Sequence, residues 1–167
     1  MKKINTKKII TERVNRLLSS AFNLETIINI IFLRPEYLYL EEDKDFETKK
    51  YTYGDVLESI NNFAYSLNQK YPNLKDSYIA LAKENSPSWV IFFFGIIKSG
   101  NKPFLVNLRY PKERINQFFK DLNIKYVIKD DNLSYDIETI DTDVLNDKAP
   151  LDYKYQFADE DRKSTRL

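Results

Sequence analysis

Residues 85–100 restrict the fold of this chain more than any other stretch, because they have the marks of a helix that is apolar on nearly every side. Ser86 is a favourable N-cap, Pro87 suits the first helical position, and Gly100 can take the left-handed conformation that ends many helices. Between these ends the apolar side chains spread well beyond a single stripe: Trp89, Val90, Ile91, Phe92, Phe93, Phe94, Ile96 and Ile97. Such a helix needs a layer of protein on both sides. At about 13 residues it is too short for a membrane span, which takes roughly 20.

The composition excludes several kinds of site. The chain of 167 residues has no Cys and no His, which removes thiolate nucleophiles, disulfides, Cys/His zinc sites and histidine acid–base chemistry. Its 26 basic and 25 acidic residues nearly cancel, so no global field favours nucleic acid or an anionic membrane. The N-terminus lacks an apolar leader with a small-residue cleavage site, so the default expectation is a cytoplasmic protein.

Two helices and a hairpin are expected at the start of the chain. The first helix is amphipathic, with Glu12, Arg13 and Arg16 on its polar side and an apolar stripe at i, i+4, i+7 and i+8 formed by Ile10, Val14, Leu17 and Leu18. Asn23 can cap a second helix that ends before the Arg34-Pro35 pair. Residues 37–41 and 48–51 then predict two strands, joined by a polar turn over residues 42–45.

Strands and helices alternate in the rest of the chain. Thr52-Tyr53-Gly54-Asp55 has the form of a capping box that opens a long helix, which must end before Pro72. Strands are expected at 77–82, 103–106 and 124–128, with weaker alternation over 135–139, and a further helix opens at Pro111. This order predicts the α/β class, as a layered parallel-sheet subdomain with flanking helices.

The expected organisation has three parts. Residues 1–34 form the N-terminal helices and residues 35–147 form the α/β subdomain. Residues 148–167 are mostly polar and lack apolar periodicity, so they are expected to be a tail or a linker.

Two patterns resemble functional motifs but fit them poorly. The segment Gly95-Ile-Ile-Lys-Ser-Gly100-Asn-Lys102 has four residues between two glycines, as in a phosphate-binding loop. In such a loop Lys directly follows the second glycine, whereas Asn101 intervenes here, so the end of a helix is the better interpretation. Acidic runs at 41–45, 130–131 and 159–161 lack the spacing of a calcium loop and are expected in solvated turns or tails.

Four segments in a fixed order resemble the adenylate-forming (AMP-binding) superfamily, which includes acyl-CoA synthetases, luciferases and the adenylation domains of peptide synthetases. Residues 51–56, Tyr-Thr-Tyr-Gly-Asp-Val, are similar to its Thr-Tyr-x-Glu-Leu motif. Residues 82–91 resemble its Asn-Ser-x-Glu-Trp-Val segment, and residues 94–100 its Ala-x-Leu-Lys-Ala-Gly segment. Residues 107–115, Asn-Leu-Arg-Tyr-Pro-Lys-Glu-Arg-Ile, resemble a run of peptide-synthetase adenylation domains, although Leu105 and Leu108 stand where prolines are usual.

The resemblance implies a ligase that activates a fatty, aryl or amino acid with ATP and magnesium as acyl-AMP, and then transfers the acyl group to the thiol of CoA or of a carrier protein. The family's phosphate loop, adenine-binding segment, ribose-binding aspartate and C-terminal catalytic lysine have no counterpart in the sequence. The 167 residues are therefore expected to be the N-terminal part of a longer ligase, truncated before the phosphate loop and inactive alone. No catalytic, cofactor-binding or metal-binding residue is assigned to them.

A second hypothesis stays open beside the ligase. The chain could be a free-standing, non-catalytic α/β module that binds a partner. A truncated ligase subdomain is expected to expose apolar surface that the remainder of the enzyme would cover, and to self-associate through it.

Overall fold

Helices and strands alternate along most of this chain, as the sequence predicts. The structure is a computed structural model, and it describes residues 6–20, 23–44 and 46–157. The elements, in chain order, are α1 (Thr6–Ser19), α2 (Leu24–Ile31), β1 (Leu38–Lys44), β2 (Glu47–Thr52), α3 (Tyr53–Lys70), β3 (Tyr78–Ala82), α4 (Pro87–Lys98), β4 (Lys102–Leu105), α5 (Lys112–Asp121), β5 (Tyr126–Lys129) and β6 (Glu138–Thr139). Contacts divide the backbone into two compact units, Met1–Leu57 and Glu58–Leu167.

The polar side of α1 lies toward α2. The Arg13 guanidinium donates a hydrogen bond to the carbonyl of Ile31 at 3.0 Å, and Glu12 pairs with Arg34 just after α2. The predicted apolar stripe of α1 is exposed instead of being packed on the protein. Helical periodicity correctly predicts the helix, but it cannot tell which face meets the neighbouring helix. The cap of α2 is as predicted, since Asn23 accepts a hydrogen bond from the Thr26 N–H at 2.8 Å.

The hairpin of β1 and β2 is longer than the sequence predicts. Residues 42–44 belong to β1 and not to the turn, because they pair in antiparallel register with residues 47–49 of β2. Charged pairs across the strands favour this extension, and Lys50 lies 3.0 Å from Glu41. The tip includes Phe46 in a left-handed conformation, with φ of 66°.

Helix α3 begins at the predicted capping box. The Thr52 N–H donates to Asp55 Oδ2 at 2.8 Å, and the Asp55 N–H donates to Thr52 Oγ1 at 3.1 Å. Both hydrogen bonds satisfy backbone N–H groups that have no acceptor within the first helical turn. The helix ends at Lys70, before Pro72 as predicted, and its buried apolar side chains are Val56, Ile60, Phe63, Ala64 and Leu67.

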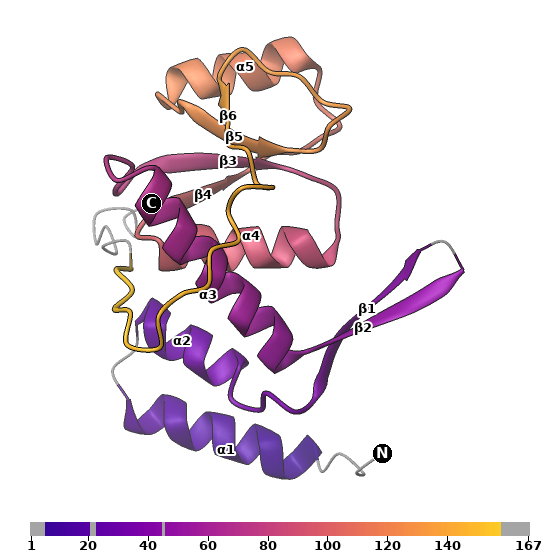
Figure 1. Ribbon diagram of the computed structural model, residues 1–167, viewed down its shortest axis with the longest axis vertical. Helices are drawn as coiled ribbons and strands as arrows, with labels where there is room; N and C mark the ends of the chain where they lie inside the picture. Colours follow the sequence, from indigo (N-terminus) through magenta and orange to yellow (C-terminus); the bar gives the residue numbers. More distant parts are fainter. Residues whose placement is uncertain (1–5, 21–22, 45, 158–167) are drawn as a thin grey trace. The chain divides into compact units, whose positions relative to one another are not determined.

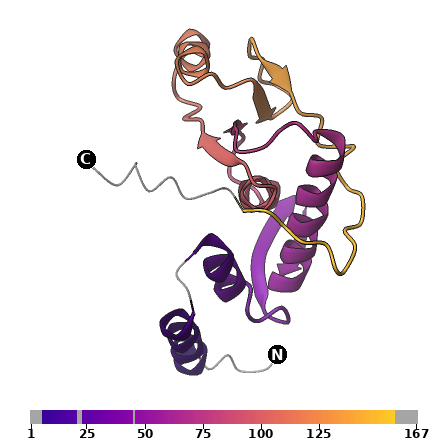
Figure 2. The same ribbon diagram turned by 90° about the vertical axis from the view of Figure 1, so that its left-hand side faces the viewer.

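The second unit is built on a four-stranded parallel sheet in the order β4-β3-β5-β6. The chain forms β3 first, adds β4 on one side, and then crosses to add β5 and β6 on the other. Helices α4 and α5 lie on opposite faces of this sheet (Figures 1 and 2). The architecture confirms the predicted α/β class with a parallel sheet, a hairpin and flanking helices.

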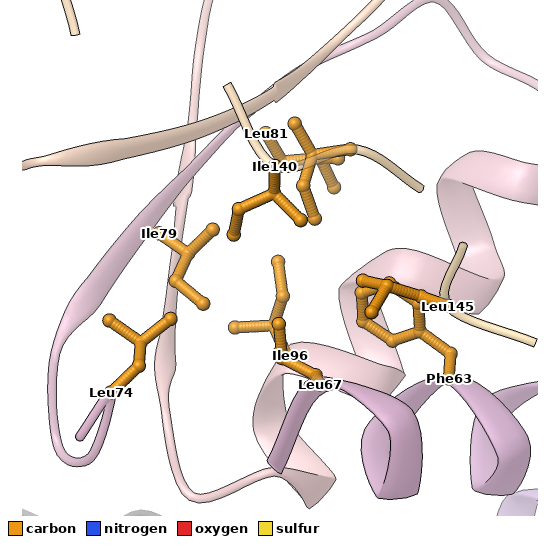
Figure 3. Close-up of a cluster of buried hydrophobic side chains, with 9 residues drawn as sticks. Phe63, Leu67, Leu74, Ile79, Leu81, Ile96, Ile140 and Leu145 are labelled. Atoms are coloured by element: carbon orange, nitrogen blue, oxygen red, sulfur yellow. The ribbon is translucent and has the colours of Figure 1, made fainter. Parts of the chain in front are cut away.

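Successive residues of β3 supply the two cores. Ile79 and Leu81 point to the face covered by α3 and α4, whereas Ala80 and Ala82 point to the face of α5. Figure 3 shows Phe63 and Leu67 of α3 gathered with Ile96 of α4 on the Ile79 side of this strand. The alternation follows from the twofold period of a strand. On the α5 side, Ile115 and Phe119 are buried, whereas Leu122 at the end of the helix is exposed.

Helix α4 has the predicted ends but less burial than predicted. Ser86 accepts a hydrogen bond from the Trp89 N–H at 3.2 Å, Pro87 stands in the first turn, and Gly100 has φ of 84°. Only its last turn is buried, while residues 87–94 are half-buried. The prediction of a helix buried on nearly every side is therefore wrong for its first two turns, because the sheet and α3 cover one side of them.

Residues 147–156, named here the strap, have no regular structure but run along α3 (Figure 1). The Asp147 N–H donates to Ser66 Oγ at 2.8 Å, and the Ala149 N–H donates to Asn62 Oδ1 at 2.9 Å. These contacts give a definite path to residues for which the sequence predicts only a polar tail. The acidic run 159–161 lies outside the described residues.

Candidate functional site

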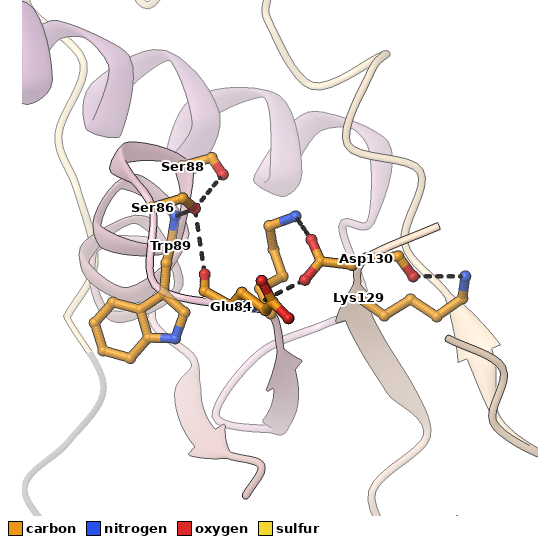
Figure 4. A network of polar contacts seen from close by, with 7 residues as sticks. Glu84, Ser86, Ser88, Trp89, Lys129 and Asp130 are labelled. Atoms are coloured by element: carbon orange, nitrogen blue, oxygen red, sulfur yellow. Dashed lines mark hydrogen bonds and ion pairs between the residues drawn. The ribbon is translucent and has the colours of Figure 1, made fainter. Parts of the chain in front are cut away.

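The carboxyl ends of β3 and β5 form the candidate site. In open parallel sheets, ligands bind at the carboxyl edge where the strand order reverses, and here the order reverses between β3 and β5. Ala82 lies opposite Lys129 in the register, so Lys83 and Asp130 leave the sheet side by side. The Lys83 ammonium pairs with Asp130 Oδ1, and the Glu84 N–H donates to Asp130 Oδ2 at 2.8 Å (Figure 4).

Asp130 is held as an anion by these two donors. Burial acts to raise the pKa of Asp130, but the hydrogen bonds from Lys83 and from the Glu84 N–H outweigh it, and the pKa is lowered. The Lys83 side chain is 15% exposed and that of Asp130 28%. Because each charge has its partner, this pair orders the loop after β3.

The same network continues into the start of α4. Ser86 Oγ donates to the Glu84 carbonyl at 3.3 Å and lies 2.9 Å from Ser88 Oγ. Lys83 Nζ also lies 5.9 Å from the ring centroid of Phe92. The edge of the sheet, the loop and the helix N-terminus are thereby fixed together, as Figure 4 shows. Sequence reasoning places Asp130 in a solvated turn and does not identify its pairing with Lys83, which is 47 positions away.

The segment that resembles a phosphate loop is a packed helix end. Gly95 lies inside α4, and a Cβ there would come within 2.3 Å of Phe63 Cδ1. Asn101, which breaks the motif, is fully buried. Its amide donates to the Leu74 carbonyl at 3.0 Å and accepts from the Ser77 N–H at 3.2 Å. The structure confirms helix termination at this segment.

A second polar cluster holds the strap at the end of α4. Lys98 is buried, hydrogen-bonds Asn61 of α3, and lies with its ammonium 4.0 Å from the ring centroid of Tyr155. Burial, and then the neighbouring Tyr153, raise the pKa of Tyr155 to about 12. The phenol therefore stays neutral beside the cation. Such a cation–π contact offsets part of the free energy that is lost when the lysine ammonium is removed from water.

The acidic residues that the structure describes do not gather into a metal-binding group. Within residues 6–20, 23–44 and 46–157, no group of three His, Cys, Asp or Glu side chains could hold a metal ion. Glu41 and Asp43 of the first acidic run are engaged across the hairpin, with Lys50 and with Thr48. No helix in the described part of the chain is long and apolar enough to cross a membrane.

Comparison with known proteins identifies a matching family. Residues 34–165 match the family model described as AMP-binding enzyme. The chain is 27% identical over 105 residues to VraA of Staphylococcus epidermidis, provisionally named a long chain fatty acid-CoA ligase, and this match covers 62% of the chain and 22% of VraA. It is 27% identical over 124 residues to gramicidin S synthase 2 of Brevibacillus brevis, covering 65% of the chain and 3% of the synthase.

A solved structure shares the fold. The N-terminal subdomain of NpsA from Klebsiella oxytoca superposes with a TM-score of 0.66 at 23% identity, over 80% of this chain and 34% of that one. The chain thus spans about a third of the NpsA subdomain and smaller shares of the two curated relatives.

Proposed function

This chain belongs to the family of AMP-binding enzymes, and we propose that it serves in a ligase that activates a carboxylate with ATP and magnesium. The product of that step is an acyl-AMP, with pyrophosphate released, and the acyl group then passes to the thiol of CoA or of a carrier protein. The observation that carries this proposal is the family match over residues 34–165, which includes the whole parallel sheet. A cytoplasmic location is part of the proposal.

The described residues do not fit a nucleotide site of their own. The chain has three glycines, and each has a structural position: Gly54 beside Pro35, Gly95 against Phe63, and Gly100 at the end of α4. At the carboxyl edge, Lys83 and Asp130 form an ion pair and neutralise each other's charge. We derive no catalytic step for these residues, and propose that this chain alone forms no adenylate.

We therefore propose that these residues have a structural role as a scaffold. The network of Lys83, Asp130 and Ser86 fixes the carboxyl edge, and Lys98 fixes the strap against α3 and α4. The half-buried aromatic side chains of α4 supply a surface for the remainder of the ligase. Without that remainder we expect the same surface to favour self-association.

Pyrophosphate exchange tests the proposal. The purified 167-residue chain is expected to give no exchange with ATP and a panel of fatty, aryl and amino acids. A longer protein that contains this chain and continues into a Ser/Thr/Gly-rich loop with a lysine is expected to give exchange with one acid of the panel. Exchange by the 167-residue chain itself would contradict the scaffold role. No exchange by the longer protein would favour the non-catalytic binding module.

A further inference from the structure

The charge of this chain is unevenly distributed. Over all 167 residues the formal net charge is +1. The first 19 residues, however, contain a single acidic residue, Glu12, and six basic ones: Lys2, Lys3, Lys7, Lys8, Arg13 and Arg16. A near-neutral total therefore conceals a basic N-terminal segment, most of which forms α1. Charge asymmetry of this kind is typical of segments that bind an anionic surface.

Lys8, Glu12 and Arg16 are spaced four residues apart and share one face of α1. Glu12 pairs with Arg34, and Arg13 bonds the Ile31 carbonyl, so both lie toward α2. Lys7, Lys8 and Arg16 are exposed. Every charged side chain of α1 that the structure describes as exposed is therefore positive.

The apolar stripe of α1 is exposed beside these cations. The exposed fractions are 56% for Ile10, 46% for Val14, 38% for Leu17 and 80% for Leu18. Spaced at i, i+4, i+7 and i+8, these four lie along one side of the helix. An open hollow of about 840 Å³ runs along the neighbouring side, and the charged residues of its lining are Lys7, Lys8, Glu12, Arg16 and Arg34.

We propose that α1 binds anionic membrane surfaces and lies in the plane of the headgroups. The stripe would enter the boundary of the acyl chains, and the cations would contact lipid phosphates, with the hollow accommodating a headgroup. A helix that exposes an apolar stripe with cations beside it has properties of interfacial helices. The exposed charged side chains of α1 are all positive, which complements a uniformly anionic surface, whereas a protein groove would demand matched charges at particular positions.

Sedimentation with lipid vesicles tests this proposal. The 167-residue chain is expected to bind vesicles of phosphatidylcholine mixed with phosphatidylglycerol, to bind pure phosphatidylcholine weakly, and to dissociate as salt is raised. Leu18→Ser is expected to weaken binding about tenfold, because one leucine leaves the apolar phase. Arg16→Glu is expected to weaken it about fivefold or more.

Matched controls come from the strap, where Leu151 is fully exposed and Lys154 is exposed. Leu151→Ser and Lys154→Glu make the same chemical changes away from α1 and are expected to bind as the unchanged chain does. The proposal is overturned if the chain ignores anionic vesicles, or if the α1 variants and the controls bind alike. It is overturned equally if Leu18→Ser lowers the thermal midpoint without vesicles, since Leu18 would then be packed within the protein.

Discussion

At the scale of single residues, Gly95 shows how the sequence permits two helices to approach. A Cβ at this position would lie 2.3 Å from Phe63 Cδ1, inside any van der Waals contact. Gly95→Ala is expected to reduce the free energy of unfolding by about 1 to 3 kcal/mol through overpacking. This loss exceeds the gain of up to about 1 kcal/mol that alanine brings to a helix interior. Urea unfolding followed by Trp89 fluorescence measures the change.

The double variant Gly95→Ala with Phe63→Leu isolates the cause. If the clash with the ring is responsible, the two substitutions together cost less than the sum of their separate costs. Additive costs, or a Gly95→Ala chain more stable than the original, would mean that α3 and α4 do not meet at this point.

Asp130 is expected to stabilise the fold only when ionised. Its pKa in the folded state is lowered below the value of about 3.9 for an unfolded chain. The folded state therefore favours the anion, and the stabilisation is complete above that unfolded value and is lost as the pH falls through the folded pKa. Asp130→Asn is expected to cost about 1 to 3 kcal/mol at neutral pH, because it leaves Lys83 without its charged partner.

Urea unfolding over a pH series checks this expectation. The difference between Asp130→Asn and the unchanged chain should shrink in acid, where Asp130 is protonated in both states. Asp131→Asn is the control, since that neighbouring side chain is exposed. A cost that is independent of pH, or one that Asp131→Asn shares, would rule out the ion pair as its source.

At the scale of elements, the ends of the helices are the best predicted features. The caps at Asn23, Thr52 and Ser86 depend on side chains within three residues of the groups that they bond, so the local sequence contains the whole interaction. The alternation of strands and helices along the chain predicts the parallel sheet. The resemblance to the adenylate-forming superfamily agrees with both.

Features that depend on distant partners were not predictable. The exposed side of α1 depends on which residues α2 and Arg34 engage, and the length of the hairpin depends on pairing between β1 and β2. The pair of Lys83 and Asp130 requires β3 and β5 to be adjacent, which the sequence does not show directly. The candidate site was therefore missed, although Lys83 immediately follows the predicted strand 77–82 and Asp130 lies two positions after the predicted strand 124–128.

The strap offers a prediction at this scale. Ser66 accepts from the Asp147 N–H and donates to the Asp147 carbonyl, so it anchors one end of the strap on α3. Ser66→Ala is expected to cost about 1 kcal/mol and to speed hydrogen exchange over residues 147–156, because the anchored amide loses its acceptor. Hydrogen exchange with mass spectrometry measures this rate for the strap peptide.

The control for the strap is Gln69→Ala, an exposed change on the same helix. It should leave the exchange of residues 147–156 unaltered. Equal exchange in Ser66→Ala and the unchanged chain would show that the strap is held by Tyr153, Tyr155 and Lys98 without this anchor.

At the scale of the whole molecule, the chain combines a parallel sheet that is covered on both faces with a helix that is covered only in part. Both faces of the parallel sheet carry buried cores. The first two turns of α4 keep Trp89, Phe93 and Phe94 only half-buried, with the rings of Trp89 and Phe93 stacked at 5.3 Å. An apolar surface that is already ordered is expected to be covered by protein in a larger assembly. The proposed remainder of the ligase would provide that cover.

Trp89 reports directly on this cover because it is the only tryptophan of the chain. In the 167-residue chain its emission should lie at longer wavelength, and acrylamide should quench it more strongly, than in a longer protein that contains the same chain. Trp89→Phe prepared in both proteins gives the background from other tryptophans. Unchanged emission and quenching would place the missing layer elsewhere. Because an uncovered α4 also predicts dye binding, a strictly monomeric 167-residue chain without dye-binding surface would argue against any missing layer.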